Sequence, residues 1–445
     1  MIINDSLHTI DELLNWLTER NKSLFVELKC ISLAECNPWF YDENIGEIRN
    51  EKRTFFQITG LKAEYSDGSI IEQPIILQNE IGFLGIICCK INNVWHYLMQ
   101  AKIEPGNVNT VQLSPTIQAT KSNFTQQHGG AKPAYLEYFL NMNSSDVLVD
   151  QIQSEQSSRF LGKRNRNVII VVKKQLEETT SHKWMTLAQI KEFMHYDNLV
   201  NMDTRTVLSC IPYVLLSEKE SDIPFVNKEL FSKSAKSLDR QTIVNIYSKI
   251  NNYKMFNKPI LTKVPLYSLN NWKMDGDRFR NIKGYPFEIV FCKISIEGRE
   301  VTNWNQPLFA ATGIATFGLL CCNDNGTYKF LVKIKPEIGC FDGIEIGPTI
   351  QNEADAKHTT DNVSELFYQK INSKTDVICD VLLSEEGGRF YQEQNRNVII
   401  QIDKNELKEL PDDYVWSDYG TLNILTQVNN CLNIQLRNLL SILEI

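Results

Sequence analysis

The feature of this sequence that most constrains its fold is an internal repeat. The segment QAKIEPGNVNTVQLSPTIQ ends at Gln118 and the similar segment VKIKPEIGCFDGIEIGPTIQ ends at Gln351, so the offset is 351 − 118 = 233 residues. The same offset relates Trp39 to Trp272, and SEQSSRFLGKRNRNVII is related to SEEGGRFYQEQNRNVII by an offset of 230. A period near 230 residues is several times longer than a solenoid or propeller unit. The sequence therefore predicts two similar domains in tandem.

The length of the chain and its hydrophobic pattern agree with this division. A chain of 445 residues is expected to form two or three domains, at about 100–200 residues per domain. We place the first repeat at residues 1–218, a linker rich in Ser, Lys and Glu at 219–240, and the second repeat at 241–445. Within each repeat, strand-like runs such as GFLGIICCKI precede helical patterns such as LAQIKEFMHY. This order predicts an α+β fold for each repeat, with mixed sheets flanked by helices.

The composition narrows the class of protein. Lys plus Arg is 46 and Asp plus Glu is 54, so the net charge is −8, which argues against a general nucleic-acid binder. No segment approaches 18 apolar residues, and the first residues lack the features of a signal peptide, so we expect no membrane span. The 11 cysteines are scattered without a CxxC spacing. They indicate reduced thiols in a cytoplasmic protein.

Polar residues that both repeats share are candidates for a ligand pocket, because a duplicated core needs only apolar character to fold. Arginine supplies planar, bidentate donors for a diphosphate, and amide or hydroxyl side chains can bind a sugar or a base. The shared residues are Lys102, Glu104, Gln118, Ser154, Glu155, Arg159, Asn165 and Arg166 in the first repeat, and Lys335, Glu337, Gln351, Ser384, Glu385, Arg389, Asn395 and Arg396 in the second. The alternative is that they build the fold through internal Arg–Glu pairs and turns braced by Asn. Buried charge is a poor stabiliser, so the set as a whole favours a pocket.

Each repeat also has polar residues of its own. The first contains ATKSNFTQQHGGAKPAY, with Asn123 and His128. The second contains Trp304 in GREVTNWNQP, and has Tyr391 where the first has Leu161. This asymmetry allows one repeat to be catalytic while the other binds ligand or is vestigial.

Several chemistries lack their sequence signatures. There is no GxGxxG after a strand and no GxxxxGK[ST], which argues against a tightly held dinucleotide and a P-loop. There is no HExxH, and the six histidines are not spaced as metal ligands. No GxSxG elbow of a serine hydrolase is present.

At AKIEPGNVNTVQLSPTIQATKSNF, HGGAKPAYLEYF, SEQSSRFLGKRNRN and NMDTRTVLSCIP, the sequence resembles the NDP-hexose 2,3-dehydratases. GREVTNWNQPL, GPTIQ and SEEGGRFYQEQNR are similar to the second-repeat motifs of that family, and the resemblance runs from about Trp39 to the C-terminus. It departs at Ser157-Ser158, where the family pattern has glycine. The resemblance implies a homodimer of two-domain subunits, each domain similar to the Nudix fold. The acidic metal-binding box of a Nudix hydrolase is absent from the sequence.

The resemblance also implies a reaction, the loss of water from a nucleotide-linked 4-keto-6-deoxyhexose such as dTDP-4-keto-6-deoxyglucose. The C4 ketone acidifies the C3 proton, a base removes it, and hydrogen-bond donors stabilise the enolate by about 3–4 kcal/mol each. An acid then protonates the departing C2 hydroxyl, and the enol tautomerises to a 3,4-diketo-2,6-dideoxysugar. There is no net redox change, so we expect neither a nicotinamide nor a metal cofactor.

Candidate roles follow from this reaction. The candidates for proton transfer are Glu104, Glu155 and His128; for the diphosphate Arg159, Arg166, Arg389 and Arg396; and for the hexose or base Gln118, Asn123, Ser154, Gln351 and Ser384, with Trp304 stacking on the pyrimidine. A salt bridge to a neighbouring cation is the alternative for each glutamate. Two other functions stay open, a non-catalytic nucleotide-sugar-binding protein and a ketoisomerase on the same substrate. A downstream 3-ketoreductase is a further expected partner.

Overall fold

The computed structural model describes residues 6–52, 55–124, 132–217, 227–235, 239–297, 302–354 and 361–445. No helix within these ranges is long and apolar enough to span a membrane.

The helices and strands recur in a similar order in the two halves of the chain. The first half contains α1 (Ile10–Lys22), β1 (Val26–Ile31), β2 (Trp39–Asp42), β3 (Glu47–Asn50), β4 (Gln57–Glu64), β5 (Ile70–Leu77), β6 (Gly82–Ile91), β7 (Val94–Ile103), β8 (Val111–Ser114), β9 (Ile117–Ala119), α2 (Lys121–Phe124), α3 (Leu136–Leu140), β10 (Val147–Ser154), β11 (Arg164–Val171), β12 (His182–Thr186), α4 (Leu187–Phe193), α5 (Met202–Ser209) and α6 (Tyr213–Ser217). The second half contains α7 (Lys228–Ser234), α8 (Arg240–Phe256), β13 (Ile260–Val264), β14 (Trp272–Asp275), β15 (Arg278–Asn281), β16 (Phe287–Ile296), β17 (Asn303–Ala311), β18 (Thr316–Asp324), β19 (Thr327–Pro336), β20 (Ile344–Gly347), β21 (Ile350–Asn352), α9 (Asn362–Ser373), β22 (Val377–Ser384), β23 (Gln394–Ile402), β24 (Tyr414–Asp418), α10 (Tyr419–Thr426) and α11 (Ile434–Ile442).

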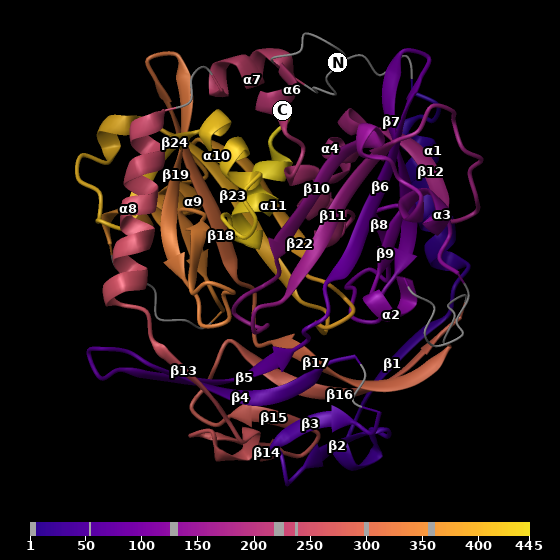
Figure 1. Cartoon of the computed structure of the whole chain (residues 1–445), viewed down its shortest axis with the longest axis vertical. Helices are drawn as coiled ribbons and strands as arrows, with labels where there is room; N and C mark the ends of the chain where they lie inside the picture. The colour runs from indigo at the N-terminus through magenta and orange to yellow at the C-terminus, as the bar shows by residue number, and fades with distance from the viewer. Residues whose placement is uncertain are drawn as a thin grey trace.

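Two seven-stranded mixed sheets, one from each repeat, lie side by side (Figure 1). In the first, the order is β10-β11-β6-β7-β12, with β8 on β7 and β9 on β6. The second has the equivalent arrangement, in which β22-β23-β18-β19 is extended by β24 and β20 on β19 and by β21 on β18. The pairs β11–β6 and β23–β18 are parallel. Strand β6 is buried along almost its whole length, which explains its continuous apolar sequence. The predicted α+β repeats with mixed sheets are confirmed.

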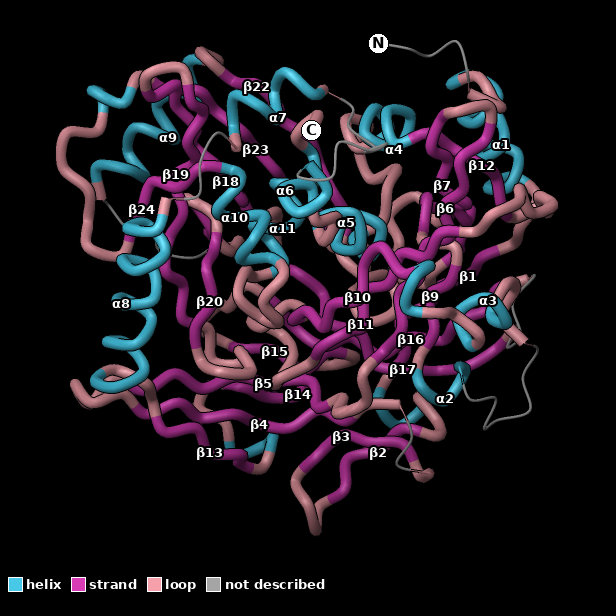
Figure 2. The backbone as a smooth tube through the Cα atoms, turned by 45° about the horizontal axis from the view of Figure 1, so that its top comes forward, coloured by secondary structure: helices cyan, strands magenta, loops and turns pink. Residues whose placement is uncertain are grey.

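The first strand of each repeat pairs with a sheet of the other repeat. Strand β1 runs antiparallel to β16, with Val26 opposite Ile296, and β13 runs antiparallel to β4, with Ile260 opposite Glu64. Two five-stranded sheets result, β1-β16-β15-β14 with β17 and β13-β4-β3-β2 with β5. Both lie below the large sheets in Figure 1, and Figure 2 shows β13, β4, β3 and β2 at the lower edge of the molecule. The two repeats are therefore interlocked by backbone hydrogen bonds.

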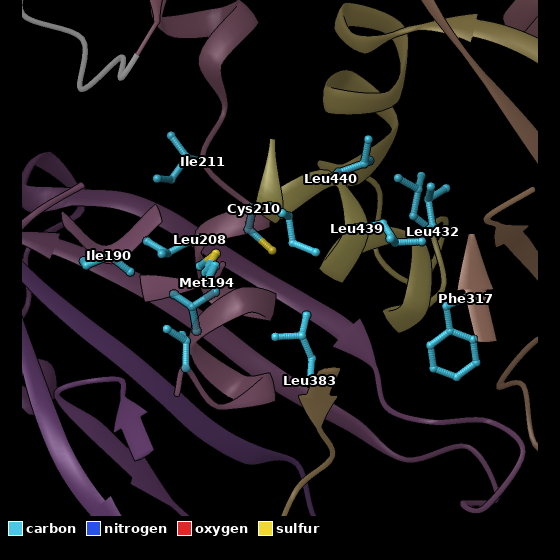
Figure 3. Close-up of a cluster of buried hydrophobic side chains, with 14 of the residues drawn as sticks. Ile190, Met194, Leu208, Cys210, Ile211, Phe317, Leu383, Leu432, Leu439 and Leu440 are labelled. Carbon is cyan, nitrogen blue, oxygen red and sulfur yellow. The ribbon is translucent and has the colours of Figure 1, made fainter. Parts of the chain in front are cut away.

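A large hydrophobic core joins the repeats between the large sheets. Helices α5 and α11 contact each other there (Figure 2). Leu208 and Cys210 of the first repeat pack in one cluster with Leu383, Leu439 and Leu440 of the second (Figure 3). Burial of a leucine side chain contributes about 1.5–3 kcal/mol. This shared core holds the ends of the large sheets, and the loops that follow them, in fixed relation.

Candidate active site

Two equivalent polar clusters lie where the repeats meet, and each takes residues from both repeats. Site 1 comprises Lys102, Glu104, Gln118, Glu155, Lys163, Asn165 and Asp203 of the first repeat with Glu386, Gly387, Gly388 and Arg389 of the second. Site 2 comprises the counterparts Lys335, Glu337, Gln351, Glu385, Glu393, Asn395 and Gln435 of the second repeat with Gln156, Ser157, Ser158 and Arg159 of the first. The sequence predicted most of these residues, but not that Arg159 and Arg389 would each serve the other repeat.

A chain of hydrogen bonds holds Glu104 at the centre of site 1. Glu104 follows β7, and its Oε1 accepts hydrogen bonds from Lys102 Nζ at 3.0 Å and from Gln118 Nε2 at 2.9 Å. Asn201, the N-cap of α5, donates through Nδ2 to Gln118 Oε1 at 3.2 Å. The buried Glu104 Oε2 has no partner among the described residues. One oxygen of this carboxylate is thus anchored while the other can accept a proton.

Site 2 repeats this chain. Glu337 Oε1 accepts from Gln351 Nε2 at 2.9 Å, and Gln351 Oε1 accepts from Asn433 Nδ2 at 2.8 Å. Glu337 Oε2 is also without a partner among the residues described. Burial raises the pKa of Glu337 to about 7. The predicted Glu and Gln pairs therefore come together in both repeats, and Asn201 and Asn433 are members that the sequence analysis missed.

The loops between β10 and β11 and between β22 and β23 complete the sites. Asn165 Nδ2 donates to Glu155 Oε1 at 2.7 Å, and Asn395 Nδ2 donates to Glu385 Oε1 at 2.6 Å. The second loop packs closely on site 1, because a Cβ on Gly387 would lie 2.9 Å from Glu104 Cβ and 2.7 Å from a backbone nitrogen. Site 1 therefore requires the glycine that the family pattern has, whereas the first loop carries Ser157 at the equivalent position.

The predicted serines lie at the contact between the repeats. Ser154 Oγ donates to Glu345 Oε2 at 2.8 Å, and Ser384 Oγ accepts from Gln112 Nε2 at 2.6 Å. Glu345 and Gln112 are counterparts at the offset of 233. These contacts brace the two loops against the opposite repeat.

Two of the four predicted diphosphate-binding arginines lie outside both sites. Arg166 forms a bidentate pair with Asp150, at 2.7 and 2.6 Å, and Arg396 forms the equivalent pair with Asp380, at 2.8 and 2.6 Å. Both pairs cross neighbouring strands and are partly exposed. The guanidinium forks are filled by carboxylates, which is the alternative that the sequence analysis left open.

The other two arginines differ in their partners. Arg159 at site 2 donates to Glu353 Oε2 at 2.9 Å and lies 3.8 Å from Glu393 Oε1. Arg389 at site 1 donates instead to neutral acceptors, Gln78 Oε1 at 3.1 Å and the carbonyl of Gly388 at 2.7 Å. None of the described carboxylates forms a salt bridge with Arg389. The positive charge at site 1 is therefore less neutralised than that at site 2.

Site 1 places the predicted Glu155 beside two titratable groups that the sequence analysis did not select, Glu386 and Lys163. Burial and the neighbouring Glu386 raise the pKa of Glu155 to about 8, and burial raises the pKa of Glu386 as well. Burial lowers the pKa of Lys163, while Glu155 and Glu386 act in the opposite direction. Lys102, Gln118 and Glu386 are only partly buried, so the cluster reaches the surface.

The predicted stacking residue, Trp304 on β17, lies next to site 1. Its Nε1 donates to Gln306 Oε1 at 3.0 Å, and Gln306 Nε2 donates to the carbonyl of Gly388 at 2.8 Å. At site 2 the counterpart of Gln306 is Gln73, which donates to the carbonyl of Ser158 at 2.8 Å, but the counterpart of Trp304 is Ile71. The tryptophan ring is therefore present only beside site 1, whereas near site 2 the hydroxyl of Tyr285 donates to Gln73 Oε1 at 2.6 Å.

The remaining predicted residues are less informative. The Tyr391 hydroxyl lies near the thiols of Cys30 on β1 and Cys292 on β16, away from both sites. His128 lies outside the described residues, and the side chain of Asn123 is not described. Within the described ranges, no group of three or more His, Cys, Asp or Glu side chains could hold a metal ion.

Similarity to known proteins agrees with this duplicated architecture. The family model described as NDP-hexose 2,3-dehydratase matches residues 10–211 and 244–443. Curated relatives named dTDP-4-dehydro-6-deoxy-α-D-glucopyranose 2,3-dehydratase are 36% identical in Saccharopolyspora spinosa, 33% in Streptomyces violaceoruber and 32% in Amycolatopsis orientalis. Each alignment covers 96% of this chain and, in the same order, 90%, 95% and 88% of the relative. The chain belongs to the NDP-hexose 2,3-dehydratase family.

Proposed function

We propose that this protein removes water across C2–C3 of dTDP-4-keto-6-deoxyglucose, giving a 3,4-diketo-2,6-dideoxysugar at site 1. The three relatives are named as 2,3-dehydratases of this dTDP-linked 4-dehydro sugar. The observation that carries the proposal is the carboxylate of Glu104. Lys102 and Gln118 hold one of its oxygens, and the other is buried without a partner.

The proposed reaction begins with Glu104 as the general base. Its free oxygen accepts the C3 proton, which the adjacent C4 ketone has made acidic. The electron pair moves to the C4 oxygen as an enolate, where each good hydrogen-bond donor contributes about 3–4 kcal/mol. Lys102 and Lys163 provide ammonium donors in this cluster. Collapse of the enolate expels the C2 oxygen, and the resulting enol tautomerises. Electrons are conserved within the sugar, so the proposed reaction uses no cofactor.

The charge distribution supports binding of the nucleotide at site 1. Arg389 forms no salt bridge with a described carboxylate, although Glu386 interacts with it electrostatically, and it is the proposed diphosphate contact, with Trp304 stacking on the pyrimidine. Gln118 and Asn123 remain proposed hexose contacts. At site 2, Glu353 forms a salt bridge with Arg159 and opposes a dianionic ligand. We propose that site 2 keeps the residual contacts of a duplicated pocket and does not turn over substrate.

The test is a reaction of purified full-length protein with dTDP-4-keto-6-deoxyglucose in D2O, followed by mass spectrometry and NMR. The proposal expects loss of one water without added cofactor and a carbon-bound deuterium at C2. An isomerised keto sugar of unchanged mass would identify a ketoisomerase. Binding of dTDP by folded protein without any turnover would identify a nucleotide-sugar-binding protein.

We further propose that each repeat is a Nudix-like domain, that two chains form a cytoplasmic homodimer, and that a 3-ketoreductase consumes the product. The duplicated mixed sheets and the family membership support the first two points. The third follows from the reactivity of a 1,2-diketone, which favours rapid reduction. Sedimentation equilibrium tests the dimer, and a coupled assay with a reductase and NADPH tests the relay.

A further inference from the structure

Asp203 is a buried carboxyl in site 1 that the steps above do not use. It is the second residue of α5, is 2% exposed, and its Oδ1 has no hydrogen-bond partner among the described residues. A buried carboxyl without a donor is costly to keep as an anion. Such a group is expected to be protonated, to meet a ligand, or both.

The surroundings of Asp203 favour its protonated form. The carboxyls of Glu155, Glu386 and Glu104 lie near it, and Lys102 and Arg205 are nearby cations. Burial, followed by these three carboxyls, raises its pKa well above the ordinary value. Its place in the first turn of α5 acts in the opposite direction, because a helix N-terminus stabilises an anion. That influence is weaker than full desolvation among three carboxyls, so the acid form persists at neutral pH.

Site 2 offers a natural comparison at the same position. The counterpart of Asp203 is Gln435, at an offset of 232, and both of its amide atoms are buried without a partner among the residues described. An amide can fill the same space and form hydrogen bonds, but it cannot donate a proton to a leaving group. The two sites thus differ at this buried position, and only site 1 has an acid there that could complete an elimination.

We propose that Asp203 is the general acid that protonates the C2 hydroxyl as it leaves. The inference rests on the proposed dehydration at site 1. Glu104 takes the C3 proton, the enolate electrons form the C2–C3 double bond, and the C2–O bond breaks. The Asp203 proton joins the departing oxygen to form water and leaves a carboxylate. That carboxylate accepts the O3 proton as the enol becomes a ketone, while C2 receives a proton from Glu104 after Glu104 has exchanged its proton with solvent, so both groups return to their starting states.

The test compares the natural substrate with its 2-deoxy-2-fluoro analogue, because fluoride leaves without protonation. Asp203→Asn is expected to lower kcat for water loss about 100-fold or more, within the usual range for general acid catalysis. Its rate of fluoride release is expected to stay within about fivefold of the unsubstituted protein. Exchange of the C3 proton with D2O should persist in the variant, since Glu104 is intact. Asp203→Glu should recover part of the rate of water loss.

The matched control is Gln435→Asn, which should leave the ratio of fluoride release to water loss within about twofold. Equal losses with both substrates in Asp203→Asn would overturn the proposal in favour of a structural role, as would an unchanged rate of water loss. Loss of C3 exchange would place Asp203 in the first step instead. Failure of the unsubstituted protein to exchange C3 or release water contradicts the proposed function itself, and is thereby distinguished from failure of the Asp203 assignment.

Discussion

Sites 1 and 2 share one hydrogen-bonded framework but differ in the charges placed on it. In both sites, the N-cap asparagine of a helix donates a hydrogen bond to a glutamine. That glutamine donates a hydrogen bond to one oxygen of a glutamate, whose other oxygen has no partner among the described residues. Site 1 adds Lys163, Asp203 and Glu386 where site 2 has Glu393, Gln435 and Gln156. The difference teaches that duplication preserves the positioning of a carboxylate, whereas a few substitutions decide whether an anionic substrate and a proton donor can be accommodated beside it.

The largest expected effect comes from removing the anchored carboxylate. Glu104→Gln should lower kcat by about 100-fold or more, because general base catalysis contributes roughly 10²–10⁴-fold. Glu337→Gln, the same change at site 2, should alter kcat by less than about threefold. Steady-state assays of both variants with the dTDP-linked ketosugar provide the measurement. Equal losses would show that both sites turn over, and a loss confined to Glu337→Gln would reverse the assignment.

The arginines sharpen the comparison at the level of binding. Arg389→Met should raise KM about 10–100-fold, since a hydrogen bond to a charged group contributes about 1.5–3 kcal/mol. Arg159→Met should instead lower the thermal midpoint, because it leaves the buried Glu393 and the partly buried Glu353 without their cation, at a cost of up to about 3–5 kcal/mol. Kinetics and differential scanning calorimetry on both variants distinguish the two outcomes. A large increase in KM for Arg159→Met alone would place the diphosphate at site 2.

A smaller effect is expected at the proposed nucleobase contact. Trp304→Ala should weaken dTDP binding about 5–100-fold, since stacking on an aromatic side chain contributes about 1–3 kcal/mol per base. Ile71→Ala at the equivalent place near site 2 should change the Kd for dTDP by less than about twofold. Isothermal titration calorimetry gives both values, and Trp304→Phe serves as a control that retains a ring. Similar losses in the two alanine variants would refute stacking at site 1.

The smallest effect concerns pH and stability. The pKa of Glu155 rises from 4.5 to about 8 in the fold, so between these values the folded protein binds more protons than the unfolded chain. Stability contributed by this group is therefore lost as the pH rises from about 4.5 to 8. Glu155→Gln should reduce the fall in thermal midpoint between pH 5 and pH 8.

Glu337→Gln provides the site 2 comparison for the same measurement. The pKa of Glu337 in the folded protein is about 7, so the pH range over which this group loses its contribution to stability ends at a lower pH than for Glu155. Its contribution to stability is therefore smaller. The decrease of the thermal midpoint with rising pH should therefore change less in Glu337→Gln than in Glu155→Gln. Identical slopes in both variants and the unsubstituted protein would show that neither carboxyl is protonated preferentially in the fold.

Much of the candidate site was visible in the sequence because the repeat displays it twice. Glu104 with Gln118 and Glu337 with Gln351 stood out as polar matches in segments that otherwise needed only apolar residues. Asp203 was not selected by the same comparison, because its counterpart is Gln435 and a search for matching polar residues passes over a position where the repeats differ. Arg166 and Arg396 match equally well, but they form cross-strand pairs with Asp150 and Asp380. A residue that both repeats share can have a structural or a functional role, and the sequence match does not distinguish the two.

The sequence by itself determined two similar α+β units and the residues common to them, because periodicity and matching segments are local properties of the chain. Only the tertiary structure decided that β1 and β13 change places and that Arg389 completes the site built around Glu104. Equivalent strands offer nearly the same hydrogen bonds and apolar surface to either partner, so no local pattern distinguishes pairing within a repeat from pairing between repeats. Which strands pair is decided by the packing of both repeats around their shared core.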